Sequence, residues 1–247
     1  MAKNEAQNIV ATVQAVRALG VPVIVLDSGS TDATPALAKE AGATVESYTY
    51  EGHASAYNEI STKRTAQGDV ALVLDADMRV SQGLVDEALR LAEAGAQVVS
   101  APIEMWWAGE RLAHGSLCPP KAFLLAGGAA HFEAIGHGER VRSGSSTATT
   151  STGLVHDDRK PYESYLLTQL RYARALTVRA AEGKLTWRDR IRQRWPWGVL
   201  AAPWVSYFWR GGVWAGRAGQ LYALDRLIAE AIVFREQVAA KSRGVPR

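Results

Sequence analysis

The stretch Val70–Val80, VALVLDADMRV, decides the fold class and raises the first question about function. Its apolar start is typical of a strand buried on both faces, and two carboxylates, Asp75 and Asp77, follow directly. Burying a carboxylate is costly unless something compensates it, and these two also repel each other. Since residues i and i+2 of a strand point the same way, both side chains can converge on one point. A cation bound there would solve both problems.

Strand and helix patterns alternate on either side of this stretch. The expected helices cover residues 4–19, 34–41, 55–66 and 81–94, and Ser81 is the expected cap of the last one. The expected strands cover residues 21–27, 43–50, 70–77 and 96–107. This alternation predicts an α/β fold with a mostly parallel sheet, right-handed crossovers and helices on both faces.

The pattern changes after residue 107. Residues 108–155 contain glycine, proline and short strand-like pieces, and the small polar stretch 143–152 is expected to be mobile. Strong helix patterns follow at 162–181 and 219–240. We therefore expect two domains, an α/β domain over residues 1–182 and a basic, tryptophan-rich helical region over 183–247.

The composition limits the protein class. With 247 residues, 47% of them hydrophobic and 21% charged, the chain can bury a substantial core. A net charge of +3 is too small to imply nucleic acid, and none is expected as a partner. The single cysteine, Cys118, excludes a disulfide framework. The first residues lack the apolar core of a signal peptide, and no apolar run approaches the length of a membrane span.

A second expected strand also ends in acids. The stretch VIVLDSGSTD ends its strand at Asp27 and adds Asp32 in the following loop. Ligands of open parallel sheets bind at the carboxyl ends of the strands. Carboxylates there suit a hard cation such as Mg²⁺ or Mn²⁺, which leaves coordination positions for the phosphates of a nucleotide diphosphate. The structural alternative is that acids at strand ends form turns and caps.

Other acid-pair enzymes fit the sequence less well. In a phosphatase of the haloacid type the acid pair follows the first strand and a threonine or valine comes two residues on, whereas Arg79 occupies that place here. A nucleotidyltransferase has a similar sheet and acid pair but needs a glycine-rich phosphate loop, and none is seen. A degenerate, membrane-peripheral binding protein without activity is the non-enzymatic alternative.

Several motifs in fixed order carry a family resemblance: AKNEAQNI at 2–9, VIVLDSGSTDAT at 23–34, the stretch from Tyr50 to Asp77, IGHGERVRS at 135–143 and HDDRKPYESYLLTQLRYA at 156–173. Together they resemble a family 2 glycosyltransferase with the GT-A fold, most similar to bacterial lipopolysaccharide-core and related envelope glycosyltransferases. The resemblance implies an inverting, metal-dependent transfer from a nucleotide-sugar, UDP-linked in our expectation, to a hydroxyl of a lipid-linked or lipopolysaccharide-type acceptor. Mg²⁺ or Mn²⁺ is the implied cofactor.

The resemblance also implies which residues bind the donor nucleotide, namely Asn4, Glu5, Asp27, Asp32 and Asp75. Asp27 matches the acid that contacts the base or ribose. Asp32 matches the second acid of that loop, where we expect it to order the loop through capping. Asp75 and Asp77 match the D-x-D motif that holds the metal and the sugar diphosphate.

A general base for the acceptor hydroxyl is implied where HDDRK stands. Asp157 and Asp158 are both candidates, with Asp158 favoured, and the other of the two is expected to cap the next helix. His137 and Glu139 are candidates for the acceptor side, and Arg171 is a candidate for facing phosphate, although its motif has shortened spacing relative to the family's.

The tail from Lys184 to Arg217 is basic and aromatic. It has seven lysines and arginines against one acid, Asp189, and it holds six of the eight tryptophans. Such a segment suits the headgroup layer of an anionic membrane, which predicts a cytoplasmic protein peripheral at the inner face of the cytoplasmic membrane. An aromatic core under a basic surface is the alternative.

The sequence departs from the family at two places. Family members begin with an apolar strand directly before the loop that holds Asn4, whereas here only three residues precede it. We expect either an upstream start or an incomplete sheet. Met78 stands where many relatives carry glutamate, which removes one polar contact.

Overall fold

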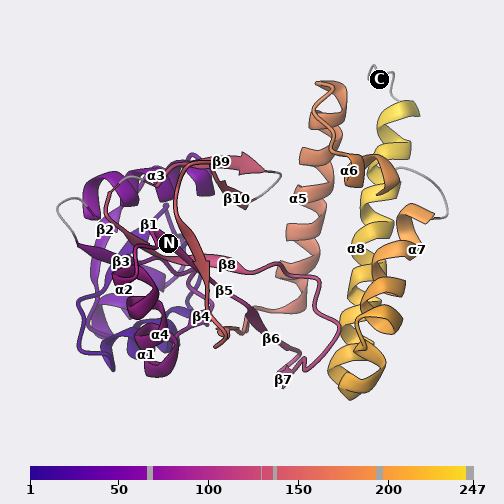
Figure 1. The fold of residues 1–247 in the computed structure, drawn as a ribbon. Coiled ribbons are helices and arrows are strands. Elements are labelled where there is room, and N and C mark those ends of the chain that lie inside the picture. The colour runs from indigo at the N-terminus through magenta and orange to yellow at the C-terminus, as the bar shows by residue number, and fades with distance from the viewer. Residues whose placement is uncertain (66–68, 129, 136–137, 193–196, 243–247) are drawn as a thin grey trace. The chain divides into compact units, whose positions relative to one another are not determined.

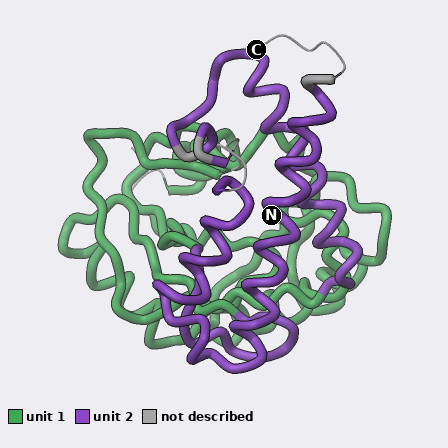
Figure 2. Tube along the Cα trace, turned by 90° about the vertical axis from the view of Figure 1, so that its right-hand side faces the viewer, with its two compact units in different colours: residues 1–105, 118–159 green, residues 106–117, 160–247 purple. Residues whose placement is uncertain are grey.

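The computed structural model describes residues 1–65, 69–128, 130–135, 138–192 and 197–242, and Figure 1 labels its helices and strands. It divides into two compact units, shown in green and purple in Figure 2. Unit 1 contains residues 1–105 and 118–159, and unit 2 contains residues 106–117 and 160–247. The division differs from the expected boundary at residue 182, because α5 (Tyr162–Ala181) packs with the C-terminal helix in unit 2.

Unit 1 begins with the expected alternation of helices and strands. Its helices are α1 (Ile9–Arg17), α2 (Thr34–Glu40), α3 (His53–Arg64) and α4 (Gln82–Glu93). Its strands are β1 (Ile24–Asp27), β2 (Thr44–Ser47), β3 (Val70–Leu72), β4 (Met78–Arg79), β5 (Val98–Ala101), β8 (Lys121–Ala126), β9 (Phe132–Ile135), β10 (Gly138–Val141), β11 (Thr147–Thr149) and β12 (Leu154–His156). The strand β6 (Ile103–Trp107) starts in unit 1 and ends in unit 2.

The α/β class is confirmed, but the sheets are mixed rather than mostly parallel. The pairs β1–β2, β11–β5 and β12–β6 are parallel, as crossover connections require. Strand β8 lies between β5 and β3 and is antiparallel to both, and β4 is antiparallel to β12. These antiparallel partners come from or pair with residues after 107, where the sequence no longer alternates between strand and helix.

The first two residues lie against the end of β1. The backbone amide of Ala2 donates to Leu26 (2.9 Å), and the amide of Ser28 donates to the carbonyl of Ala2 (3.0 Å). The terminal ammonium of Met1 donates to the carbonyl of Leu74 (2.9 Å). These bonds connect the end of β1, which carries Asp27, to the segment that carries Asp75.

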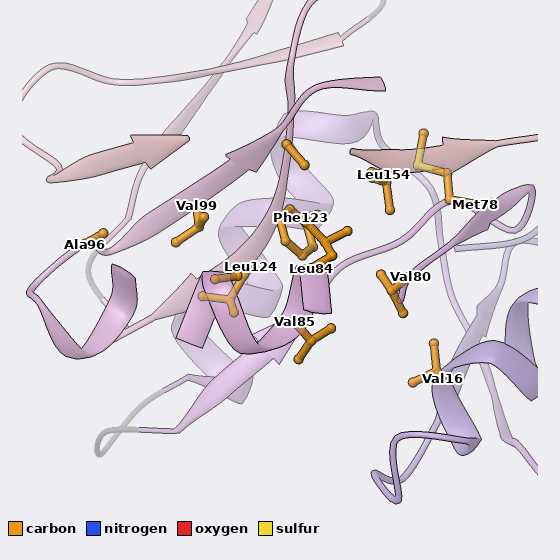
Figure 3. Packing of buried hydrophobic residues seen from close by; sticks show 12 residues of the cluster. Val16, Met78, Val80, Leu84, Val85, Ala96, Val99, Phe123, Leu124 and Leu154 are labelled. Carbon is orange, nitrogen blue, oxygen red and sulfur yellow. The ribbon is translucent and has the colours of Figure 1, made fainter. Parts of the chain in front are cut away.

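The largest core cluster of unit 1 packs α4 against the sheet (Figure 3). Ser81 caps this helix as expected, since its hydroxyl accepts a hydrogen bond from the amide of Leu84. The apolar face of the helix meets Phe123 and Leu124 of β8 and Leu154 of β12. This packing holds β8 and β12 in place, and both strands carry residues of the site described below.

Unit 2 is mainly helical. It contains β7 (Glu110–Arg111), α5, α6 (Trp187–Arg192), α7 (Trp197–Trp204), a π-helix η2 (Val205–Trp209), a 3₁₀ helix η3 (Gly212–Ala215) and α8 (Gly216–Ser242). Ala173 and Leu176 of α5 pack against Val233 of α8. Buried Asp225 accepts hydrogen bonds from Trp107 (2.7 Å) and Tyr162 (2.5 Å). Among the described residues, no helix has the length and apolarity that crossing a membrane takes.

Candidate functional site

The pairing of β4 with β12 brings two predicted groups of acids together. Met78 is opposite His156 in this antiparallel pair, and the amide of Asp157 donates to the carbonyl of Asp77 (3.0 Å). The D-x-D segment therefore lies beside residues 156–158, although the two are far apart in the sequence. Although β4 and β12 are short, β12 is also held on its other side by its pairing with β6.

Asp77 is paired with His156. The Nε2 atom of His156 lies 3.4 Å from a carboxylate oxygen of Asp77, and both side chains are largely buried. Burial opposes protonation of this imidazole, but the hydrogen bond to Asp77 and the carboxylates of Asp75 and Asp158 raise its pKa above the ordinary value. The imidazolium would therefore offset part of the negative charge at this point.

Asp75 is paired with Lys121, the first residue of β8. The Nζ atom lies 3.1 Å from Asp75 and 3.5 Å from Glu139, with the ring of Tyr57 beneath it at 5.6 Å from the centroid. Burial disfavours the ammonium, but Asp75, Tyr57 and Glu139 together raise the pKa of Lys121. A fixed positive charge therefore faces the first acid of the D-x-D motif.

Asp157 is enclosed by two arginines. Its Oδ2 atom accepts hydrogen bonds from Arg79 (2.8 Å) and Arg159 (2.9 Å), and the residue is buried. Burial alone would raise the pKa of this carboxyl, but the bonds from both guanidinium groups lower it below the ordinary value. A carboxylate so stabilised is a poor proton acceptor.

Asp158 is exposed and points to a different neighbour. Its Oδ1 atom accepts a hydrogen bond from the side-chain amide of Asn8 (2.9 Å). The same amide group donates to Glu5 (2.8 Å), and the Oδ1 atom of Asn8 accepts from the backbone of Arg159 (2.9 Å). Asn8 thus orients Asp158 and fixes it relative to the loop that follows Met1.

The residues expected to bind the nucleotide mostly form hydrogen bonds within and between the two loops that contain them. Asn4 has a left-handed backbone (φ 56°), and its side chain accepts from the amide of Thr31 (2.8 Å). Asp27 accepts from Ser30 and the amide of Gly29, and Asp32 accepts from Thr34 and the amide of Ala6. These bonds join loop 2–8 to loop 28–33, and Asp32 takes part in them, whereas the N-cap position of α2 is Ala33.

A family comparison finds a match for the N-terminal part of the chain. Residues 1–118 match the family model described as Glycosyl transferase family 2. The N-terminal part of the chain, residues 1–118, is therefore similar to glycosyltransferase family 2. The matched region covers the D-x-D segment, α1 and both expected nucleotide loops.

Two solved structures are similar to this chain at low sequence identity. One, titled "Crystal Structure of a Mycobacterial Protein", is 22% identical over 71% of each chain, with a TM-score of 0.47. Another is mannosyl-3-phosphoglycerate synthase from Rubrobacter xylanophilus, 16% identical over 75% of this chain and 74% of that one, with a TM-score of 0.44. No curated protein matches the sequence.

Two further candidate residues do not join these contacts. Arg171 lies on α5 in unit 2, where its guanidinium donates to the hydroxyl of Thr168 (2.9 Å). His137 lies outside the described residues. Glu139, by contrast, both pairs with Lys121 and lines a cavity of about 360 Å³, whose wall also holds the hydroxyls of Ser100, Thr147 and Thr149.

The carboxylates fit a metal that takes most of its remaining ligands from a substrate. Among the described parts of the chain, no group of three or more histidine, cysteine, aspartate or glutamate residues forms a cation site. Asp75 and Asp77 supply hard oxygen atoms, which Mg²⁺ and Mn²⁺ prefer, and Mg²⁺ in phosphate sites is commonly held by one or two carboxylates plus phosphates. A cation that arrives with a nucleotide could use these oxygen atoms, but it would have to displace the contacts of Asp75 with Lys121 and of Asp77 with His156.

Sequence reasoning missed Lys121 and Asn8. A lysine that opens the apolar stretch KAFLLA signals a charge next to a buried strand, and the buried acids Asp75 and Glu139 are its natural partners. Asn8 lies three residues after Glu5, the spacing of a side-chain pair on one turn of helix. Its bond to Asp158 depends on tertiary structure, so no local signal could have revealed it.

Proposed function

We propose that this protein transfers a sugar, with inversion, from a nucleoside diphosphate donor to a hydroxyl of a lipid-linked or lipopolysaccharide-type acceptor in cell-envelope glycan synthesis. UDP is the nucleotide that we propose. The observation that carries this proposal is the position of residues 156–158 beside Asp77, which puts an exposed carboxylate next to the acids of the D-x-D segment.

The donor side would use fixed charges of both signs. Asp75 and Asp77 would hold Mg²⁺ or Mn²⁺, which would neutralise the diphosphate as it leaves. Lys121 holds Asp75 in place and keeps a positive charge near the same point. The joined loops that contain Asn4, Glu5, Asp27 and Asp32 would form the nucleotide side, with Asp27 and Asp32 acting mainly through loop shape.

The chemical step would need one proton acceptor. The acceptor hydroxyl attacks the anomeric carbon, its O–H proton passes to a carboxylate, and the bond from the anomeric carbon to the diphosphate oxygen breaks. Asp158 is our proposed base, because it is exposed and accepts a hydrogen bond from a neutral amide. Asp157 would instead form ion pairs with Arg79 and Arg159, and these pairs would fix the conformation of residues 156–159.

The acceptor side and the cellular place are further parts of the proposal. Glu139, which pairs with Lys121, also lines the cavity, and we propose that its wall of polar and apolar residues holds part of the acceptor. A lipid-linked acceptor requires the protein to work at a membrane surface, and we propose the inner face of the cytoplasmic membrane. Exposed tryptophans of the segment 184–217 support this placement.

Isothermal titration calorimetry with UDP, GDP and dTDP, each with and without Mn²⁺, tests the donor side. We expect one of these nucleotides, UDP in our proposal, to bind only with Mn²⁺, and Asp77→Asn to weaken that binding at least about tenfold by removing a charged ligand. Asp86→Asn changes a half-buried acid of α4 that accepts a hydrogen bond from Gln82; this variant is the matched control and should bind like the wild type. Binding of no nucleotide by the wild type would contradict the proposal.

A further inference from the structure

Unit 2 exposes an apolar stripe along α7 and η2. Trp197, Leu200, Trp204 and Phe208 recur every three or four residues, so they share one helix face. Their exposed fractions are 68%, 47%, 54% and 59%, and the rings of Trp204 and Phe208 lie 6.1 Å apart. A surface helix normally turns such a face towards the core. These four residues, named here the aromatic stripe, therefore form a surface that a binding partner would cover.

The opposite side of the same segment is tightly fixed within unit 2. Gly198 and Val199 are buried, and the buried hydroxyl of Ser206 donates to the carbonyl of Gly115 (2.8 Å). A Cβ atom on Gly219 of α8 would collide with the carbonyl oxygen of Gly212. Figure 1 shows α7 running beside α8. The aromatic stripe is thus turned outward by close packing behind it.

Aromatic and basic residues continue from the stripe. Trp209 and Trp214, at 78% and 82%, are the most exposed large hydrophobic side chains among the described residues. Between Arg190 and Leu224 the sequence has five arginines and no acid, although Arg192 pairs with Glu230 and Arg217 with Glu110. Arg210 directly follows Trp209. A partner that suits this surface is apolar on one side and negatively charged on the other.

We propose that the aromatic stripe docks onto the headgroup boundary of an anionic lipid bilayer. Tryptophan is enriched at that boundary because its indole is amphipathic, and arginines gain from a negative lipid surface. Helices of this kind lie in the interface plane rather than cross it. The purpose of the docking rests on the proposed lipid-linked acceptor, but its physical basis lies wholly in unit 2.

Vesicle flotation with the full chain tests the proposal. We expect binding to vesicles of phosphatidylcholine with one quarter phosphatidylglycerol, weaker binding to phosphatidylcholine alone, and a decrease in high salt. The double variant Trp204→Gln/Phe208→Gln should lose at least about tenfold in partitioning, since two aromatic side chains no longer leave water. Because both positions are exposed, its melting temperature should stay close to that of the wild type.

A matched pair of leucines controls for a general loss of apolar surface. Leu200→Gln lies in the aromatic stripe, whereas Leu167→Gln changes a leucine of α5 that is equally exposed to solvent or more so. Only Leu200→Gln should weaken flotation. Equal losses from both leucines, or wild-type flotation of the double variant, would overturn the proposal.

Two other outcomes would also overturn it. If the wild type fails to float with the anionic vesicles, the stripe does not bind lipid. If light scattering shows a dimer that the double variant dissolves, and vesicles do not bind, the stripe is an interface between two copies of the chain. Nucleotide binding at Asp77, measured separately by calorimetry, decides the proposed function independently of every flotation result.

Discussion

Asp157 and Asp158 are adjacent in sequence but have opposite environments. Asp157 is buried between Arg79 and Arg159, whereas Asp158 is exposed and bonded to Asn8. From sequence alone the two are interchangeable, because the partners that separate them come from other elements. The structure therefore distinguishes the two carboxylates, which the motif HDDRK does not.

Asp157→Asn should lower the stability of the protein and not only its activity. The change removes the charge that two guanidinium groups share, so we expect a loss of about 2 kcal/mol in the free energy of unfolding at neutral pH. The pKa of Asp157 is below its ordinary value of 3.8 in the folded state. Its contribution is thus fully present above that value and is lost as pH falls through the folded pKa.

Urea denaturation of the wild type and of Asp157→Asn at pH 7 and near pH 3 measures this effect. The difference between the two proteins should shrink at the lower pH. A difference that stays constant, or one that grows, would mean that the ion pairs with Arg79 and Arg159 contribute no stability.

Lys121 gives a second prediction at the residue scale. Lys121→Gln leaves Asp75 and Glu139 largely buried without their shared cation, so both stability and nucleotide binding should fall. We expect the dissociation constant for the preferred nucleotide to rise at least about tenfold. Lys63→Gln, an exposed lysine of α3 paired with Glu59, is the control, and equal affinity of the two variants in calorimetry would argue against a donor-side role.

Elements were predictable where the pattern was local. The helix 81–94 with its Ser81 cap and the helix 162–181 match α4 and α5 closely. The stretch 143–152 was expected to be mobile, but residues 147–149 form β11, which pairs with β5. The strand was not expected, because Thr147 and Thr149 stand among small polar residues and their partner strand is distant in sequence.

Two helix glycines should respond in opposite directions to alanine. Gly83 in α4 has open space where a Cβ would lie, whereas Gly219 in α8 touches the backbone of Gly212. Gly83→Ala should therefore stabilise by about 0.5–1 kcal/mol through helix propensity. Gly219→Ala should destabilise by about 2 kcal/mol or more through overpacking.

Chemical denaturation followed by circular dichroism measures both glycine variants. Stabilisation by Gly219→Ala would show that α8 and η3 are packed less closely than described. It would also weaken the argument that the aromatic stripe is turned outward by close packing.

At the scale of the whole molecule, the sequence predicted the α/β class and the family but not the sheet order. Alternation over the first half predicts parallel strands correctly for β1 and β2. It could not predict that β8 enters between β3 and β5, because the long connection from β6 to β8 has no periodic pattern. The position of residues 156–158 beside Asp77 depends on such long-range pairing, which a resemblance can imply and local physics cannot.

The central proposal, that an exposed aspartate beside the D-x-D segment deprotonates the acceptor, is tested most directly by one comparison. Release of nucleoside diphosphate from the preferred nucleotide-sugar, with water as the attacking hydroxyl, is measured for the wild type and Asp158→Asn, and donor binding is checked by calorimetry. We predict that turnover falls by about 10²–10⁴-fold while donor affinity and melting temperature stay unchanged, as loss of a general base requires. Unchanged turnover in Asp158→Asn would contradict the proposal.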